Sequence, residues 1–144
     1  MEGAIQMTEQ PPLKLMARAA EDVTVFSALL QDALVASSDI RFIRDENSFV
    51  LLANRYCWED GEQTSQRRLS GLKIGAVEKV QKKQMSLTAG QFYNLLSIAY
   101  EEAGNCMILT FSGGGALRLQ ISAINALLHD VAEAHPSFAR PEHN

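Results

Sequence analysis

The chain has 144 residues, of which 47% are hydrophobic and 21% are charged, and its formal net charge is −4. A chain of this length and composition buries a real core as one domain, which excludes a disordered protein. The small negative charge argues against a general nucleic-acid binder, and no apolar run is long enough to cross a bilayer, so we expect no membrane insertion.

Cysteine usage and the N-terminal sequence indicate a cytoplasmic protein. The two cysteines, Cys57 and Cys106, lack the C-x-x-C spacing of metal and redox motifs. The N-terminus does not join a charged stretch to an apolar one, as a signal peptide does. We expect a flexible leader over 1–12, a single α+β domain over 13–135 and a flexible tail over 136–144.

The domain is expected to begin with a short strand over 13–17 and a helix over 21–35. The apolar stripe of the helix, at near-helical spacing, consists of Val23, Phe26, Leu30, Ala33 and Leu34. Glu21 and Asp22 suit its first turn because carboxylates are favourable near a helix N-terminus.

Four strands are predicted to follow this helix. They cover 40–44, 49–57, 68–74 and 76–83. The first two flank Asp45-Glu46-Asn47, an ordinary hairpin connection. The continuous apolar run 49–53 suits a strand that is covered on both faces. Gly75 marks a bulge or bend, and the lysine-rich strand after it resembles a protected sheet edge.

The last third of the chain changes its period. Apolar and polar residues alternate over 96–100, 107–111 and 117–121, with turn residues between the runs, which predicts a three-stranded meander. A helical stripe then takes over, formed by Ile124, Leu127, Leu128 and Val131. This stripe predicts an amphipathic C-terminal helix.

These elements predict an α+β fold. We expect an antiparallel seven-stranded curved sheet or partly open barrel, capped by the C-terminal helix, with an extra N-terminal helix. The element order is similar to that of pleckstrin-homology domains. The alternative is a layered α+β sandwich with both helices on one face of a single antiparallel sheet.

Four strings of the sequence carry a family resemblance. They are Ala-Leu-Leu-Gln-Asp-Ala at 28–33, Asn-Arg-Tyr-Cys-Trp-Glu at 54–59, the pair Arg67-Arg68, and Phe-Ser-Gly-Gly-Gly-Ala-Leu-Arg-Leu at 111–119. In this order they resemble DUF2948, an alphaproteobacterial family catalogued only as a domain of unknown function. The resemblance runs from about 13 to 135 and implies a small bacterial cytoplasmic protein. It brings no activity, cofactor or catalytic residue, and the family favours an acid where this chain has Cys57.

The segment 54–59 is the best candidate for a functional surface. On a strand, Asn54, Tyr56 and Trp58 point one way, and Arg55, Cys57 and Glu59 the other. Arginine, tyrosine and tryptophan dominate binding hot spots. The structural alternative is an aromatic edge of the core with an Arg–Glu pair. Together with nearby basic residues, the candidate binding residues are Arg55, Tyr56, Trp58, Arg67, Arg68 and Lys73.

A local excess of positive charge lies between residues 67 and 83. Its members are Arg67, Arg68, Lys73, Lys79, Lys82 and Lys83, against the single acid Glu78. Such a face suits an acidic partner, a phosphorylated ligand or RNA phosphates. The alternative is a solvated strand face whose lysines protect a sheet edge.

No motif in the sequence predicts catalysis. The glycines of Ser-Gly-Gly-Gly at 112–115 join two expected strands, so they indicate a tight turn that needs positive φ rather than a phosphate cradle. The three histidines, His129, His135 and His143, lack zinc-motif spacing. We therefore expect no catalytic residue, no metal and no cofactor.

The sequence favours a non-enzymatic binding or adaptor module that recognises a protein partner or an anionic ligand, and it leaves enzymatic activity open. The alternatives are a small enzyme that acts on a phosphorylated metabolite and an RNA-associated domain. An exposed sheet edge would also allow a homodimer.

Overall fold

The fold is built almost entirely from antiparallel strands. The computed structural model describes residues 12–56, 66–88, 90–131 and 135–136. Within these residues, eleven strands form one antiparallel sheet that is accompanied by a single α-helix, α2 (Ala20–Leu29). The strands are β1 (Lys14–Ala17), β2 (Ala33–Ala36), β3 (Ile40–Ile43), β4 (Ser48–Tyr56), β5 (Gln66–Ile74), β6 (Val77–Lys83), β7 (Phe92–Glu101), β8 (Cys106–Phe111), β9 (Ala116–Ile121), β10 (Ala126–Asp130) and β11 (His135–Pro136).

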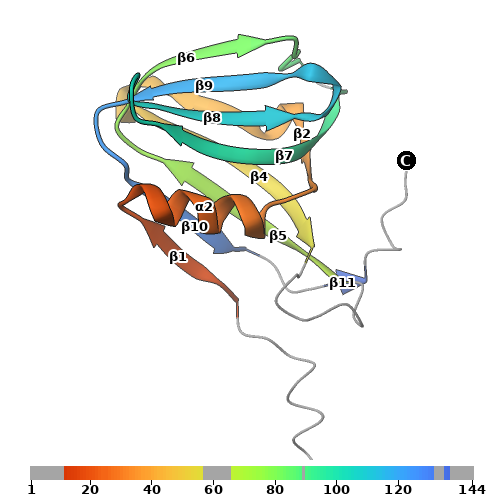
Figure 1. Cartoon of the computed structure of the whole chain (residues 1–144). Coiled ribbons are helices and arrows are strands. Elements are labelled where there is room, and N and C mark those ends of the chain that lie inside the picture. The colour runs from red at the N-terminus through yellow and green to blue at the C-terminus, as the bar shows by residue number, and fades with distance from the viewer. Residues whose placement is uncertain (1–11, 57–65, 89, 132–134, 137–144) are drawn as a thin grey trace, which may run out of the picture.

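The sheet curls into two layers (Figure 1). The strand order is β1-β10-β5-β4-β2-β7-β8-β9-β6, with β3 paired to β4 and β11 paired to β5. One layer holds β1, β10, β5 and β4, and the other holds β7, β8, β9 and β6. The short strand β2 joins them, because it pairs with β7 over four residues and with β4 at Leu34↔Asn54.

The meander of the last third is confirmed. The strands β7, β8 and β9 pair in sequence, and in β8 and β9 alternate residues face the core, as the period of two requires. In β7 the expected alternation is interrupted, because the register shifts between Leu95 and Ser97, so that Leu95 and Ile98 are buried and Leu96 is exposed. The glycine turn is also as predicted, since Gly113 and Gly114 have φ values of 79° and 84°. Asn105, in the preceding turn, has a φ of 52°.

The fold-class prediction is wrong in its C-terminal element. The stripe residues 124–131 form no helix, and β10 occupies their centre, paired with β5 on one side and β1 on the other. Leu128 is fully buried, whereas Val131 is 44% exposed, so the residues of the expected stripe lie on opposite faces of a strand. Without that helix, neither the seven-stranded capped sheet of pleckstrin-homology type nor the two-helix sandwich describes the chain.

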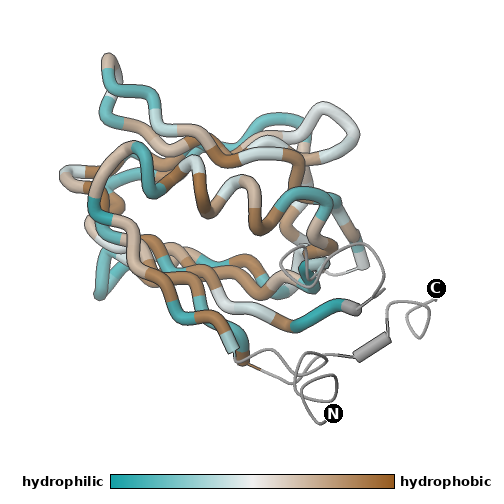
Figure 2. Tube along the Cα trace, turned by 60° about the horizontal axis from the view of Figure 1, so that its bottom comes forward, coloured by the Kyte–Doolittle hydropathy of each residue, from teal (hydrophilic) through white to brown (hydrophobic). Residues whose placement is uncertain are grey.

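The N-terminal helix closes the interior instead. Helix α2 lies against β7 and β1 and buries Val23 and Phe26 at its inner side, and Leu30, which follows the helix, is fully buried. Figure 2 shows hydrophobic residues recurring along α2 and along the strands on either side of it. The helix is shorter than predicted, because Asp32 adopts a φ of 65° and residues 33–36 pair with β7 as β2.

The beginning of α2 follows from its acidic first turn, as expected. The Asp22 carboxylate accepts hydrogen bonds from the backbone N–H groups of Arg18 and Ala19, at 2.9 and 3.1 Å. In the part of the chain that the structure describes, α2 is too short to reach across a bilayer, and no longer apolar helix is present. The predicted leader and tail lie almost entirely outside the described residues.

Candidate functional site

The candidate arginines lie on both faces of the β4–β5–β10 layer. On the inner face, which faces the core, β4 contributes Phe49, Leu51 and Ala53 and then Arg55, so the apolar row ends in a guanidinium. The register pairs Arg55 with Arg68 on β5 and Tyr56 with Arg67. Neighbouring residues on a strand point to opposite sides, so Arg55 and Arg68 share the inner face and Tyr56 and Arg67 the outer one.

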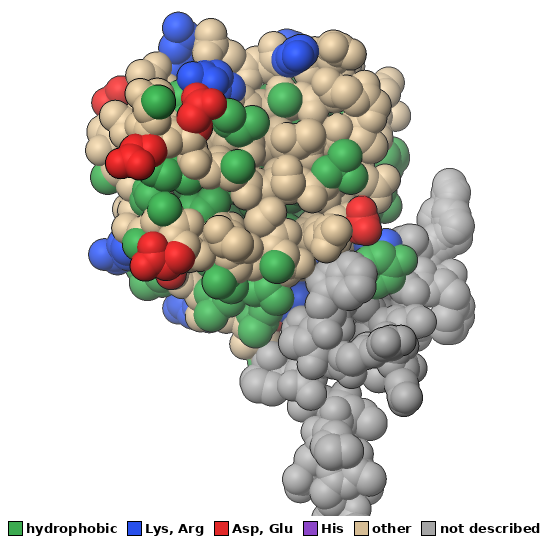
Figure 3. All heavy atoms as spheres, viewed as in Figure 1, with side chains coloured by type: hydrophobic (Ala, Val, Ile, Leu, Met, Phe, Trp, Pro, Cys, Tyr) green, Lys and Arg blue, Asp and Glu red, His purple; other side chains and the backbone are tan. Residues whose placement is uncertain are grey.

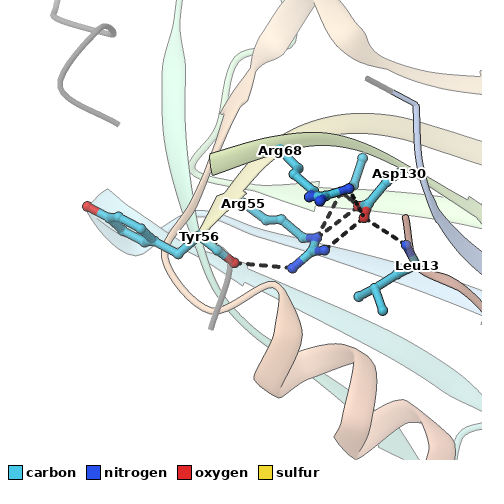
Figure 4. Close-up of polar contacts among 6 residues, drawn as sticks. Leu13, Arg55, Tyr56, Arg68 and Asp130 are labelled. Atoms are coloured by element: carbon cyan, nitrogen blue, oxygen red, sulfur yellow. Dashed lines mark hydrogen bonds and ion pairs between the residues drawn. The ribbon is translucent and has the colours of Figure 1, made fainter. Parts of the chain in front are cut away.

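A buried ion pair holds Arg55. Its side chain and that of Asp130, at the end of β10, have no solvent-exposed surface. Two hydrogen bonds join them, from Arg55 Nε to Asp130 Oδ1 at 3.0 Å and from Nη2 to Oδ2 at 2.9 Å. Ser70 donates to Oδ1 at 2.6 Å. The Leu13 backbone N–H donates to Oδ2 at 2.8 Å (Figure 4). This bidentate geometry is the strong form of an arginine–carboxylate contact.

The environment of Asp130 keeps its carboxylate charged. Burial by itself raises the pKa of Asp130. The hydrogen bonds from Arg55, Leu13 and Ser70, with the positive charge of Arg55, outweigh burial and leave this pKa below the ordinary value of an aspartate. A carboxylate held in this way is a poor proton donor or acceptor near neutral pH, so its role is structural.

Arg68 belongs to the same cluster. Its Nη1 lies 3.7 Å from Asp130 Oδ2, and the residue is only 6% exposed. Figure 4 shows Arg55 and Arg68 converging on Asp130 from the two neighbouring strands. We call Arg55, Arg68, Ser70 and Asp130 the inner charge cluster.

Arg67 lies on the other side of the sheet with Tyr56. Its guanidinium carbon is 3.8 Å from the centre of the Tyr56 ring, and its Nη1 donates to the backbone oxygen of Asn54 at 2.7 Å. The residue is 4% exposed. Figure 4 shows the Tyr56 side chain pointing away from the inner charge cluster. The structure therefore brings Tyr56 and Arg67 together as the sequence suggested, but apart from Arg55 and Arg68.

The lysines do not join the arginines in one basic face. Lys79, Lys82 and Lys83 are exposed on β6, which ends the strand order opposite β1. Lys73 lies on β5, half-exposed, in a loose ion pair of 3.9 Å with Glu46. Figure 3 shows acidic and basic side chains scattered over the face that carries α2. This arrangement matches the edge-protection interpretation of β6.

The remaining candidate residues are Trp58, Cys57 and the histidines, and only some of them lie within the described residues. Trp58 and Cys57 lie outside the described residues, as does His143. His129 is on β10, and the described residues contain no group of three or more potential metal ligands.

A groove of about 450 Å³ lies on the outer face of the β4–β5–β10 layer. Its lining residues are Asp39, Arg41, Val50, Leu51, Leu52, Gly71, Leu72, Lys73, His129 and Val131. Gly71 lets the His129 side chain lie close over β5, because a Cβ there would lie 3.2 Å from His129 Nε2 and 3.7 Å from Val131 Cγ1. A glycine inside a strand often marks a place where another group approaches closely, and here that group is the His129 side chain. We call this surface the outer groove.

A second hollow of about 500 Å³ lies between α2 and β7. The side chains that line it are small, apolar or uncharged, among them Thr24, Ser27, Leu96 and Tyr100. Ser27 Oγ accepts a hydrogen bond from the backbone N–H of Ile98 at 2.9 Å, which ties the helix to the strand where β2 has ended.

Sequence reasoning missed Asp130 and most of the outer groove. Asp130 is 75 residues from Arg55, and nothing in local spacing links the two. One indication that Arg55 is buried is present in the sequence. Arg55 follows Phe49, Leu51 and Ala53 at steps of two, so it shares their face of the strand. Lys73 is the one predicted binding residue that lines the outer groove.

Comparison with known proteins gives a family but no activity. None of the curated proteins matches the chain. A family described as "Protein of unknown function (DUF2948)" matches residues 13–143, which includes both faces of the β4–β5–β10 layer. Because this match covers nearly the whole chain, the protein belongs to the DUF2948 family.

Proposed function

We propose that this protein is a non-enzymatic binding module that recognises a segment of a partner protein through the outer groove. The observation that carries the proposal is a hollow with a mainly apolar lining that is bordered by the charged side chains of Asp39, Arg41 and Lys73. Its volume of about 450 Å³ lies within the range of ligand sites and suits the side chains of a short segment.

The lining of the outer groove indicates the chemistry of the partner. Leu52 and Val131 are 36% and 44% exposed, and both line the same hollow. Exposed apolar side chains that gather at one place suggest a contact surface. Among the lining residues, two basic side chains, Arg41 and Lys73, outnumber the single acidic side chain, Asp39. A segment with a large apolar side chain beside a carboxylate is complementary to this surface.

Two further features support this proposal. The lysines of β6 lie at the opposite end of the strand order, where they suit edge protection better than a nucleic-acid surface. A cytoplasmic location fits the buried free thiol of Cys106, since thiols stay reduced there.

Site-specific photo-crosslinking in cells tests the proposal. A benzophenone amino acid placed at Leu52 reports on the outer groove, and the same group at Val25, 49% exposed on α2, is the matched control. We expect the Leu52 position to capture a partner that the Val25 position does not. Lys73→Glu should weaken that capture about tenfold or more, whereas Lys83→Glu on β6 should leave it unchanged.

The captured segment decides the outcome. Peptide mapping should place the crosslink on a segment that carries a carboxylate near a large apolar residue. Equal capture from both positions, an insensitivity to Lys73→Glu, or a crosslink to a second copy of this chain would each overturn the proposal.

A further inference from the structure

We propose a second binding site, an oxyanion notch on the outer face of β4 and β5 formed by Arg67 and Asn54, for a carboxylate or phosphate group. It is separate from the outer groove, because neither residue lines that groove. The two proposals therefore stand or fall independently.

The position of the Arg67 guanidinium is fixed by its surroundings. One face of the guanidinium stacks on Tyr56, with the carbon 3.8 Å from the ring centre. Its Nη1 is held by the Asn54 backbone oxygen at 2.7 Å. These contacts leave the Nε edge of the group without a partner among the described residues, and this edge of a guanidinium has a geometry suited to carboxylates and phosphates.

The charge of Arg67 lacks a counter-charge within the described residues. Arg55 has Asp130 at 2.9 Å, but no described carboxylate lies within ion-pair distance of Arg67, although the residue is 96% buried. Burial of an uncompensated guanidinium is strongly unfavourable, so such groups are ordinarily paired. An anion at the notch supplies the missing charge.

Two buried polar atoms on this face also lack partners among the described residues. They are Arg67 Nε, a donor, and Asn54 Oδ1, an acceptor. The amide oxygen and nitrogen of asparagine exchange places when χ2 turns by half a rotation, so Asn54 can present N–H donors to the same ligand. The notch thus combines a guanidinium edge with an amide that adapts to the bound oxyanion.

Titration of the full-length protein with inorganic phosphate and with acetate tests the site, with chloride at equal ionic strength as the reference. The readout is the Arg67 Nε–H resonance in ¹⁵N-edited NMR, assigned by through-bond correlation. We expect one of the two anions to move this resonance saturably. A response to phosphate alone identifies a phosphorylated ligand, and a response to acetate alone identifies a carboxylate.

Variants make the test specific. Arg67→Lys keeps the charge and removes the guanidinium Nε–H, so binding to the variants is followed by isothermal titration calorimetry. The responsive anion should bind Arg67→Lys at least about tenfold more weakly than the wild type. Arg44→Lys is the matched control, since Arg44 also stacks on a ring, that of Phe42 at 5.4 Å, but is exposed. The proposal is overturned if neither anion moves the wild-type resonance, or if both variants bind as the wild type does. If Arg67→Lys does not fold, the titration of the wild type alone decides whether the site binds an anion.

Discussion

Replacing Asp130 by asparagine tests the inner charge cluster. The substitution removes the negative charge that receives two hydrogen bonds from Arg55, while both side chains lie in the core without solvent exposure. Loss of one member of a buried ion pair leaves the other charged and unpaired, at a cost of about 3–5 kcal/mol. The free energy of unfolding should fall by about that amount at pH 7, and the melting temperature by roughly 6–20 °C.

The loss should depend on pH in a defined direction. The pKa of Asp130 is lower in the folded protein than in the unfolded chain, where it is about 3.9. The carboxylate therefore stabilises the fold fully above that value, and its contribution is lost as the pH falls through the lowered folded pKa. The difference between wild type and Asp130→Asn should be greatest near neutral pH and should shrink below about pH 4.

Urea unfolding followed by circular dichroism at several pH values measures both effects. Glu101→Gln is the matched control, because Glu101 pairs with Arg118 at 3.0 Å but both side chains are more than 40% exposed. Its cost should stay below about 1 kcal/mol. A cost below 1 kcal/mol for Asp130→Asn as well, or a cost that does not change between pH 7 and pH 3, would refute the assignment of this cluster as a charged structural element.

Three further predictions concern the fold. Leu128→Ala should cost about 2–5 kcal/mol and Leu127→Ala clearly less, because only Leu128 faces the core; similar costs by urea unfolding would contradict the strand assignment of β10. Phe26→Ala should cost about 3–5 kcal/mol in the same assay, since this side chain closes the interior; a cost near zero would mean that α2 is not packed there. Replacing Lys82 and Lys83 by valine should promote self-association through the β6 edge, measured by sedimentation, and a variant that stays as dispersed as the wild type would argue against edge protection.

Most strands were predictable because one of their faces is apolar and the other polar. The alternation in β8 and β9 reflects their single buried face, whereas the register shift between Leu95 and Ser97 in β7 was not visible in the sequence. The strand β10 lacked this signal. Its sequence Ala-Leu-Leu-His-Asp places Leu127 on the outer face and Leu128 in the core, so two adjacent leucines mimicked a helical stripe. A short apolar run of this kind does not distinguish a helix from a strand by its period.

The candidate site was harder to predict because it depends on burial and on distant pairing. Arginine is rarely fully buried, so Arg55 was expected at a surface. It is buried because a carboxylate from the far end of the chain meets it, and only the three-dimensional register of β4, β5 and β10 brings the two together. The outer groove depends in the same way on Gly71 lying opposite His129, a pairing that local sequence does not encode.

The pairing of β1 with β10 has a consequence for biosynthesis. The Leu13 amide bonds to Asp130 across a separation of 117 residues, and β1 pairs with no strand other than β10 among the described residues. During translation β1 therefore cannot pair until residues 126–130 have left the ribosome. Contacts between such remote segments slow folding. A nascent chain that stalls before β10 has emerged would expose the unpaired edges of β1 and β5. Chaperones that hold unfolded chains would be needed at these edges.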